Sequence, residues 1–318
     1  MSCGFSFFSL SFQFKRPAYC RFIVGINKKS ILSLAGERVV LFDGGMGSTI
    51  VSLGLPEGEC PESWNLTHSE AIAEIHRKNL EAGADVIETN TFGANRLRLA
   101  SFGYDDQVEE INLRAVQIAK KVCPEDKFVA GDIGPCGAFL KPVGKSSIDE
   151  FEESFLEQAK ALARAQVDLF SIETMYDLRE AVAAIRAVRT VSDLPVFASM
   201  TFDKKPRGYL TMMGNTVPEC AAQLEKAGAD VVGANCTLGS DVMIELTREL
   251  RVTTDLPIII QPNAGKPRLN RGKPFYPKDS KSFAEDMKLI AEAGANFVGG
   301  CCGTTDEFIR EIRRRLSG

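Results

Sequence analysis

The sequence predicts an α/β protein built as a single (β/α)8 barrel, or TIM barrel, preceded by a short N-terminal extension. The first observation behind this prediction is a pattern that occurs four times: a helix-like run ends at a turn resembling Gly-Ala-Asp and continues into a short apolar strand. Its copies are residues 81–91, 164–174, 226–236 and 292–302. Successive copies lie about two strand-plus-helix units apart, at roughly 30 residues per unit, so one further strand is expected between each pair.

The second observation is that these further strands are present. Short apolar segments occur at residues 39–43, 128–132, 195–201 and 256–261. Helical periodicity fills the intervals: a capping box at Thr67 and Glu70 begins one helix, residues 148–162 form another, and residues 308–316 supply a last helix that closes the ring. Alternation of apolar strands with helices is typical of a parallel sheet covered by helices. An open doubly wound sheet is the alternative.

The third observation is length: without its first 38 residues the 318-residue chain has about 280 residues, which suits eight strand-plus-helix units of one barrel, typically roughly 250 residues in all. We therefore expect residues 1–38 to be an extension and residues 39–318 to be the barrel, with no room for a second domain. Residues 5–14 are apolar but too few to span a bilayer, and basic residues follow this run instead of preceding it as in a secretory signal. The extension is expected to have no role in the fold, as after a start codon assigned too early; an organellar presequence is the alternative.

Composition excludes several classes of function. Hydrophobic residues make up 44% and charged residues 25% of the chain, which is the balance of a globular protein with a sizeable core. The net charge is -4 and the first thirty residues are basic, so the barrel is more acidic than the whole chain and offers no surface for nucleic acid. Nine cysteines, an odd count, indicate a reducing compartment. We expect a cytoplasmic protein that binds neither nucleic acid nor a membrane.

Polar and thiol side chains follow the predicted strands. In a barrel of this kind the carboxyl ends of the strands converge on one mouth, where active sites form. The residues at these positions are Asp43, Asn90, Thr91, Asp132, Glu173, Thr201, Cys236, Asn263, Cys301 and Cys302. We therefore expect the functional site to lie among them.

Three of these residues are cysteines. Cys236 ends the sixth strand, and Cys301 and Cys302 end the eighth, so their thiols are predicted to meet at one side of the mouth. Three thiolates suit zinc and leave the fourth ligand position open, as in catalytic zinc sites. The only histidines, His68 and His76, lie on a predicted helix away from the mouth. A disulfide between the two adjacent cysteines is the alternative.

A glycine-rich turn follows the first strand, at residues 43–49. Its exposed backbone N–H groups could hold a substrate carboxylate. The spacing matches neither the dinucleotide-binding nor the Walker motif, so nucleotide binding is not indicated.

Seven segments at the mouth resemble, in the same order, those of the zinc-dependent homocysteine S-methyltransferases. This family includes the homocysteine-binding module of cobalamin-dependent methionine synthase and betaine–homocysteine methyltransferase. The segments are 42–47 (FDGGMG), 88–94 (ETNTFGA), 131–135 (GDIGP), 172–174 (IET), 234–236 (ANC), 262–265 (PNAG) and 299–303 (GGCCG). The last segment together with the upstream Asn-Cys is highly specific, and the resemblance covers roughly residues 37–318.

The resemblance implies a (β/α)8 barrel that transfers a methyl group to the thiolate of homocysteine and produces methionine. It places the three zinc ligands at Cys236, Cys301 and Cys302. It also implies that acidic residues and the glycine turn hold the amino acid end of homocysteine. The implied substrate-binding residues are Asp43, Gly44, Gly45, Gly47, Thr91, Glu173 and Asn263.

The methyl donor is the least determined part of this prediction. Betaine is disfavoured because Gly93 stands where the betaine enzymes carry a tyrosine, and Trp64 does not align with their cage tryptophan. The segment 262–267 is closest to methionine synthase, which implies methylcobalamin, yet the chain has no D-x-H-x-x-G corrinoid motif. We expect a methylcorrinoid supplied by a separate protein. S-methylmethionine, betaine, a non-catalytic zinc barrel in a methyl-transfer complex, and a Schiff-base lyase using Lys266 are the alternatives.

Overall fold

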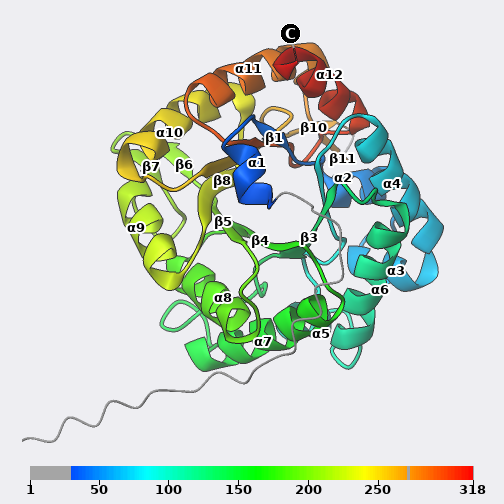
Figure 1. Cartoon of the computed structure of the whole chain (residues 1–318). Coiled ribbons are helices and arrows are strands. Elements are labelled where there is room, and N and C mark those ends of the chain that lie inside the picture. The colour runs from blue at the N-terminus through cyan, green and yellow to red at the C-terminus, as the bar shows by residue number, and fades with distance from the viewer. Residues whose placement is uncertain (1–29, 271–272, 318) are drawn as a thin grey trace, which may run out of the picture.

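The computed structural model describes residues 30–270 and 273–317 and contains the predicted barrel (Figure 1). Among these residues, eight parallel strands are hydrogen-bonded in the order β1-β12-β9-β8-β5-β4-β3-β2. A parallel bridge between Phe42 and Val86 joins the two ends of this order and closes the ring, so the open sheet is wrong. The strands are β1 (Val40–Leu41), β2 (Val86–Glu88), β3 (Phe128–Ile133), β4 (Leu169–Met175), β5 (Val196–Met200), β8 (Val231–Gly239), β9 (Ile258–Asn263) and β12 (Phe297–Val298).

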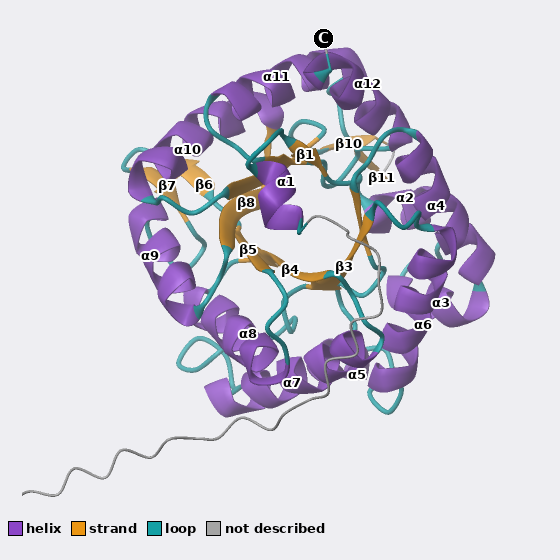
Figure 2. Cartoon of the chain, in the orientation of Figure 1, coloured by secondary structure: helices purple, strands orange, loops and turns teal. Residues whose placement is uncertain are grey.

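One long helix follows each barrel strand in the described part of the chain, and together these helices form the outer ring seen in Figure 2. They are α4 (Ser69–Glu81), α6 (Val108–Val122), α7 (Ile148–Arg164), α8 (Leu178–Val191), α9 (Val217–Ala227), α10 (Ser240–Thr253), α11 (Ser280–Glu292) and α12 (Asp306–Leu316). The loops at the carboxyl ends of the strands carry the short additional elements. These are α2 (Met46–Ser52), the 3-10 helix η1 (Pro61–Ser63), α3 (Trp64–Thr67), α5 (Arg96–Ala100) and the hairpins β6–β7 (Asp203–Lys205, Gly208–Leu210) and β10–β11 (Arg268–Asn270, Lys273–Phe275).

The helix starts follow local capping chemistry, with one correction. Ser147 forms a full capping box with Glu150 at the start of α7, as the pattern beginning at residue 148 predicts. The capping box predicted at Thr67 does not form, because α4 begins at Ser69 with His68 as its N-cap residue. Thr67 instead ends the short helix α3 and donates its hydroxyl to the Ser63 carbonyl.

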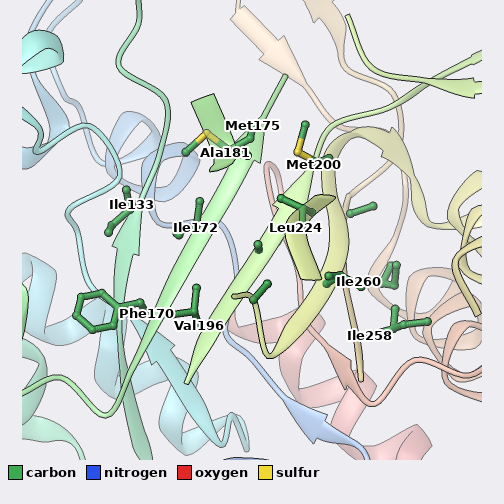
Figure 3. Packing of buried hydrophobic residues seen from close by; sticks show 14 of the residues in the cluster. Ile133, Phe170, Ile172, Met175, Ala181, Val196, Met200, Leu224, Ile258 and Ile260 are labelled. Carbon is green, nitrogen blue, oxygen red and sulfur yellow. The ribbon is translucent and has the colours of Figure 1, made fainter. Parts of the chain in front are cut away.

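The space between the strands and the outer helices is filled by one large apolar cluster. Figure 3 shows part of it, where outward-facing strand residues such as Phe170 and Ile258 meet residues of the covering helices such as Leu224. These side chains are fully buried. Their burial holds the helices against the sheet and makes the barrel a rigid support for the loops at its mouth.

The amino-terminal end of the barrel interior is apolar and closed. The rings of Phe42, Phe197 and Phe297 pack on one another with centroids 4.7–6.1 Å apart. The short helix α1 (Ile31–Ala35) lies across this end (Figure 1) and buries Ile31 in the same cluster. Residues 30–38, which were expected to have no role in the fold, therefore pack on the barrel. Residues 1–29 lie outside the described part of the chain.

Candidate functional site

The carboxyl ends of the strands bring together the three cysteines that the sequence predicted. The Sγ atoms of Cys236, Cys301 and Cys302 all lie within 4.8 Å of one another, and we call them the thiol cluster. Cys236 lies in β8 with a left-handed backbone (φ 57°), which turns the strand end toward the mouth. All three cysteines are free thiols, so the structure does not contain the alternative disulfide.

The loop after β12 aims two adjacent thiols at one point because its glycines allow close packing. A Cβ atom at Gly299 would lie 2.7 Å from the Cβ of Phe42, so a larger residue cannot fit there. The backbone N–H of Cys301 donates to the Pro262 carbonyl (2.8 Å), and that of Cys302 donates to Asn263 Oδ1 (3.1 Å). These bonds fix the loop on the end of β9. Asn263 therefore acts here by supporting the thiol cluster.

In the protein alone, the surroundings of the thiol cluster favour one thiolate. Contacts with Cys236 and Cys301 lower the pKa of Cys302 to about 3, whereas contacts with Cys236 and Cys302, followed by burial, raise the pKa of Cys301 well above its ordinary value. A thiolate flanked by two protonated thiols is a soft, anionic donor set. It fits zinc, which would displace the remaining protons and keep a fourth position open.

Beside the thiols lies a group of carboxyls. Oxygen atoms of Glu88, Asp132 and Glu173 lie within 4.8 Å of one another, and Asp43 Oδ2 accepts the backbone N–H of Glu88 at 3.1 Å. We call these four residues the mouth carboxyls. Burial, followed by the charge of neighbouring carboxylates, raises the pKa of Asp43 and Glu173 well above the usual range.

The mouth carboxyls are not neutralised by the protein. Among residues 30–270 and 273–317, no lysine or arginine forms an ion pair with any of them. Three of their oxygen atoms, Asp43 Oδ1, Glu88 Oε1 and Asp132 Oδ1, are buried without a hydrogen-bond partner. Buried polar atoms are normally paired, so these oxygens indicate that a donor or a cation comes from outside the chain.

Two amides hold the carboxyls in place, and sequence reasoning assigned no role to either. Asn235 donates to Glu173 Oε2 and to Thr174 Oγ1, both at 2.7 Å, and approaches the Cys301 sulfur at 4.0 Å. Gln261 donates to Glu88 Oε2 at 2.8 Å. Asn235 directly precedes Cys236 in β8, and Gln261 lies two residues before Asn263 in β9. Because residues two apart in a strand point to the same side, the prediction of Asn263 as a site residue could have indicated Gln261.

The glycine turn offers fewer free amides than the sequence suggested. The N–H of Gly44 donates to Asn79 Oδ1 (3.2 Å), and that of Gly45 donates to the Thr304 carbonyl and hydroxyl (both 3.1 Å). Both amides are thus engaged within the protein. Gly47 lies in the first turn of α2, and no atom lies within 4 Å of the position that its Cβ would occupy.

The remaining predicted residues lie at the edge of the site or away from it. Thr91 is fully buried and donates its hydroxyl to the Asp132 carbonyl (2.7 Å), so it connects the ends of β2 and β3. His68 stacks on Trp64 with ring centroids 4.4 Å apart, and His76 is buried in α4, where burial lowers its pKa to about 4. Neither histidine belongs to a metal-binding group of the described residues. Lys266 is exposed after β9.

Two groups of described residues could therefore hold a metal ion. The thiol cluster suits zinc, whereas the oxygen-only group of Glu88, Asp132 and Glu173 would suit a harder cation. No helix in the described part of the chain is long and apolar enough to cross a bilayer.

Comparison with known proteins identifies the family of the chain. The sequence model of the homocysteine S-methyltransferase family matches residues 40–316. The methionine synthases of Mycobacterium leprae (strain TN) and Mycobacterium tuberculosis (strain ATCC 25618 / H37Rv) are 32% and 33% identical to the chain over 301 residues, or 89% of it. These matches cover 24% and 25% of the two synthases, so the chain spans about a quarter of their length.

Solved structures show the same fold. The metallated form of the homocysteine methyltransferase MmuM from Escherichia coli matches with a TM-score of 0.74 at 22% sequence identity, over 90% of this chain and 100% of that chain. Its apo form matches with a TM-score of 0.70 at 21% identity, over 90% and 98% of the two chains. The family match spans the barrel from β1 to α12 and includes the thiol cluster. The chain therefore belongs to the homocysteine S-methyltransferase family, whose members are methyltransferases acting on homocysteine.

Proposed function

We propose that the barrel binds zinc through its thiol cluster and transfers a methyl group to the sulfur of homocysteine, giving methionine. The observation that carries the proposal is the juxtaposition of three thiols within 4.8 Å with buried carboxyls, three of whose oxygen atoms have no hydrogen-bond partner among the described residues. A soft-metal site next to an anionic pocket suits a substrate that has a thiol at one end and an ammonium group at the other.

Cys236, Cys301 and Cys302 would hold the zinc, which would supply Lewis-acid chemistry: it would lower the pKa of the homocysteine thiol, about 8.5 in water, so that this thiol ionises at neutral pH. In the transfer, the sulfur of the homocysteine thiolate would attack the methyl carbon, a carbon–sulfur bond would form, and the donor would leave with the electron pair of its bond to the methyl group. The sulfur loses its negative charge in this step, which favours release of methionine.

The chain's own residues orient the substrate. In this proposal, Glu173 and Asp43 hold the ammonium group of homocysteine, and Asn235 keeps Glu173 in position through its 2.7 Å hydrogen bond. The N–H of Gly47, in the first turn of α2, is proposed to bind the substrate carboxylate, because the N–H groups of Gly44 and Gly45 donate elsewhere. Thr91 and Asn263 support the strand ends and the thiol loop.

The donor that we propose is a methylcorrinoid presented by a partner protein. The similarity to methionine synthases supports this assignment. A cage for a quaternary ammonium donor is not supported, because Trp64 is buried against His68 in the helix layer. The use of cysteine as free thiols supports a cytoplasmic location.

The experiment that tests the proposal measures methionine formation by the zinc-loaded protein from homocysteine. Methylcobalamin, methylcobalamin on a corrinoid protein, S-methylmethionine and betaine are supplied in parallel. Methionine with either corrinoid donor supports the proposal in full, and methionine with only S-methylmethionine or betaine retains the acceptor chemistry but overturns the donor. No methionine with any donor would favour a non-catalytic zinc barrel.

A further inference from the structure

The loops on one side of the mouth are basic although the chain as a whole is acidic. The loops after β3, β5 and β9, residues 134–147, 201–216 and 264–279, together contain ten lysine and arginine residues and two acidic residues, whereas the whole chain has a net charge of -4. The loop after β1, residues 42–68, contains four acidic residues and no lysine or arginine. Because β5 lies opposite β1 in the ring, positive and negative charge are separated across the mouth.

The three basic loops adjoin one another. Thr237, near the end of β8, donates its hydroxyl to the carbonyl of Phe202 in the β5 loop (3.0 Å). A Cβ atom at Gly239, the last residue of β8, would lie 3.2 Å from the Cα of Gly265 in the β9 loop. A surface cavity of about 830 Å³ joins the β3 and β5 loops and is lined from both, by Leu140, Lys141, Ser146, Met213 and Asn215 among others. Since Thr237 directly follows Cys236, this basic surface also borders the thiol cluster.

Most of the described cations on these loops are not used by the protein itself. Five of them have exposed side chains and form no ion pair with another described residue: Lys141, Lys145, Arg207, Lys266 and Arg268. The other described lysine side chains of these loops are paired with acidic residues. The five free cations are therefore available to an anionic partner.

Large apolar side chains are exposed between these cations. Phe139, Val143, Met212 and Phe275 are between 42% and 67% exposed, and all four lie on the same three loops. We call the five cations and these four residues the basic rim. Exposed apolar groups framed by charged ones are typical of a surface that binds another protein. The phosphates of a nucleic acid would use the cations but would leave Val143 and Met212 uncovered.

We propose that the basic rim docks an acidic face of the protein that carries the methyl donor. This inference rests on the proposed function, in which the donor comes from a partner protein. Charge complementarity selects an acidic face, and the acidic loop after β1 repels the same face, so the two together fix the orientation of the partner over the mouth. Attraction of this kind acts before contact and raises the rate of association.

The test reverses one cation on each loop in the triple variant Lys145→Glu/Arg207→Glu/Arg268→Glu. The donor is the methylcobalamin-loaded corrinoid protein of the activity assay, and free methylcobalamin is supplied in parallel. With the corrinoid protein, we expect kcat/KM to fall about tenfold and to depend less on salt than in the wild type. With free methylcobalamin, the rim variant should match the wild type, because none of the three residues contacts the thiol cluster or the mouth carboxyls.

A control triple variant makes the same change in charge on the outer helices. It is Arg114→Glu/Lys160→Glu/Lys226→Glu, at exposed positions of α6, α7 and α9 that form no ion pair with another described residue. This variant should retain kcat/KM within about twofold with both donors. Circular dichroism checks that each variant folds.

A second readout does not depend on activity. The probe is a fluorescent peptide of glutamate with interspersed leucine, and its binding to the metal-free protein is measured by anisotropy. We expect the rim variant to bind it about tenfold more weakly than the wild type and the control variant to bind it as the wild type does. The same peptide with serine in place of leucine should bind the wild type more weakly, because Phe139 and Met212 then have no apolar partner.

Three results would overturn the inference. The first is wild-type kcat/KM of the rim variant with the corrinoid protein, and the second is an equal loss in the rim and control variants, which would reflect net charge alone. The third is tighter binding of single-stranded DNA of equal charge than of the leucine peptide, which would indicate a nucleic-acid surface. If the wild-type protein forms no methionine from any donor, the proposed function fails, and the docking inference fails with it even where the peptide binds.

Discussion

Buried carboxylates occur at both ends of the barrel, but only one end supplies cations for them. Asp85, at the start of β2, is 2% exposed and is surrounded by three bases: Arg38 (2.7 Å), Lys127 (3.0 Å) and Arg313 (2.6 Å). It also accepts the N–H of Leu41 at 3.0 Å. Burial alone would raise the pKa of Asp85, but these hydrogen bonds and charges hold it well below its usual range.

The mouth carboxyls have the opposite environment. No ion pair in the described part of the chain involves them. Burial raises the pKa of all four, and the charge of neighbouring carboxylates raises the pKa of Asp43, Asp132 and Glu173 further. A buried charge that is paired supports the fold, whereas an unpaired one costs stability and persists where function requires it. At the amino end the protein itself supplies the cations for its buried carboxylate, which supports the fold. At the carboxyl end it supplies none for the mouth carboxyls in the described residues, and we propose that a cationic group of the ligand takes that place.

The largest effect is expected at the thiol cluster. Cys301→Ser replaces a soft ligand by a hydroxyl that zinc binds poorly, so the variant should lose its zinc and nearly all methyl transfer. Cys123→Ser, at the end of α6, is the matched control and should keep both. Metal analysis and methionine formation check this. Full activity of Cys301→Ser with no bound zinc would contradict the assigned role of the cluster.

The next largest effect is expected at the amino end. Asp85→Ala leaves three cations without their anion, and removal of one partner from a buried ion pair costs about 3–5 kcal/mol of unfolding free energy. Urea denaturation measures this loss, with the exposed Asp126→Ala as a control that should change stability by less than about 0.5 kcal/mol. Activity per folded molecule should be retained. A loss of homocysteine affinity in folded Asp85→Ala would erase the distinction between the two ends.

Substitution of a mouth carboxyl should weaken substrate binding and leave stability unchanged, which is the reverse of the result expected for Asp85→Ala. Glu173→Gln keeps the hydrogen bond from Asn235 but removes the charge proposed to hold the substrate ammonium, which is worth about 2 kcal/mol, or roughly a thirtyfold rise in KM for homocysteine. Asp43→Asn should act in the same direction. Neither change should lower zinc content or stability. Glu180→Gln, a fully buried carboxyl outside the mouth, is the control, and zinc loss in Glu173→Gln would contradict the separation of metal and substrate roles.

The smallest effect is the pH dependence of stability in the metal-free and ligand-free protein. Folding raises the pKa of the mouth carboxyls, so the folded protein holds their protons more tightly than the unfolded chain does. Their contribution to the free energy of unfolding is therefore lost as pH rises from their unfolded pKa values of about 4 through the raised values. The loss is about 1.4 kcal/mol per unit of pKa shift for each group that ionises. For Asp85 folding lowers the pKa, so its contribution is lost as pH falls below about 4. In Asp132→Asn the free energy of unfolding should therefore decrease less steeply as pH rises. Urea denaturation at several pH values between 5 and 8 measures this slope. If the slope of the unfolding free energy against pH is the same in Asp132→Asn as in the wild type, folding does not raise the pKa of Asp132.

The strands, the outer helices and the thiol cluster could be predicted from the sequence because each depends on a local pattern. Apolar strands, helical periodicity and the rule that strand ends converge are sufficient to bring Cys236 near Cys301. The unpaired state of the mouth carboxyls could not be predicted in this way, since it depends on which bases the folded chain places elsewhere. The engagement of the Gly44 and Gly45 amides is also a tertiary effect, because their acceptors, Asn79 and Thr304, lie on other elements.

Two local predictions failed for physical reasons. The capping box at Thr67 has the right residue types, but the preceding turn is already helical, so the start of α4 moves to Ser69. Residues 30–38 have no strand or long helical pattern, and their role in closing the barrel arises from the phenylalanine cluster beneath α1. Short elements of this kind depend on packing partners that are distant in sequence.

X-ray absorption at the zinc edge, recorded with and without homocysteine, tests the central claim most directly. The account predicts three sulfur ligands and one lighter ligand in the zinc-loaded protein, and four sulfur ligands once homocysteine is bound. The same number of sulfur ligands in both states would contradict the claim that the fourth position takes the substrate thiol. A shell of oxygen ligands alone would place the metal on Glu88, Asp132 and Glu173 and would contradict the assignment of the thiol cluster as the metal site.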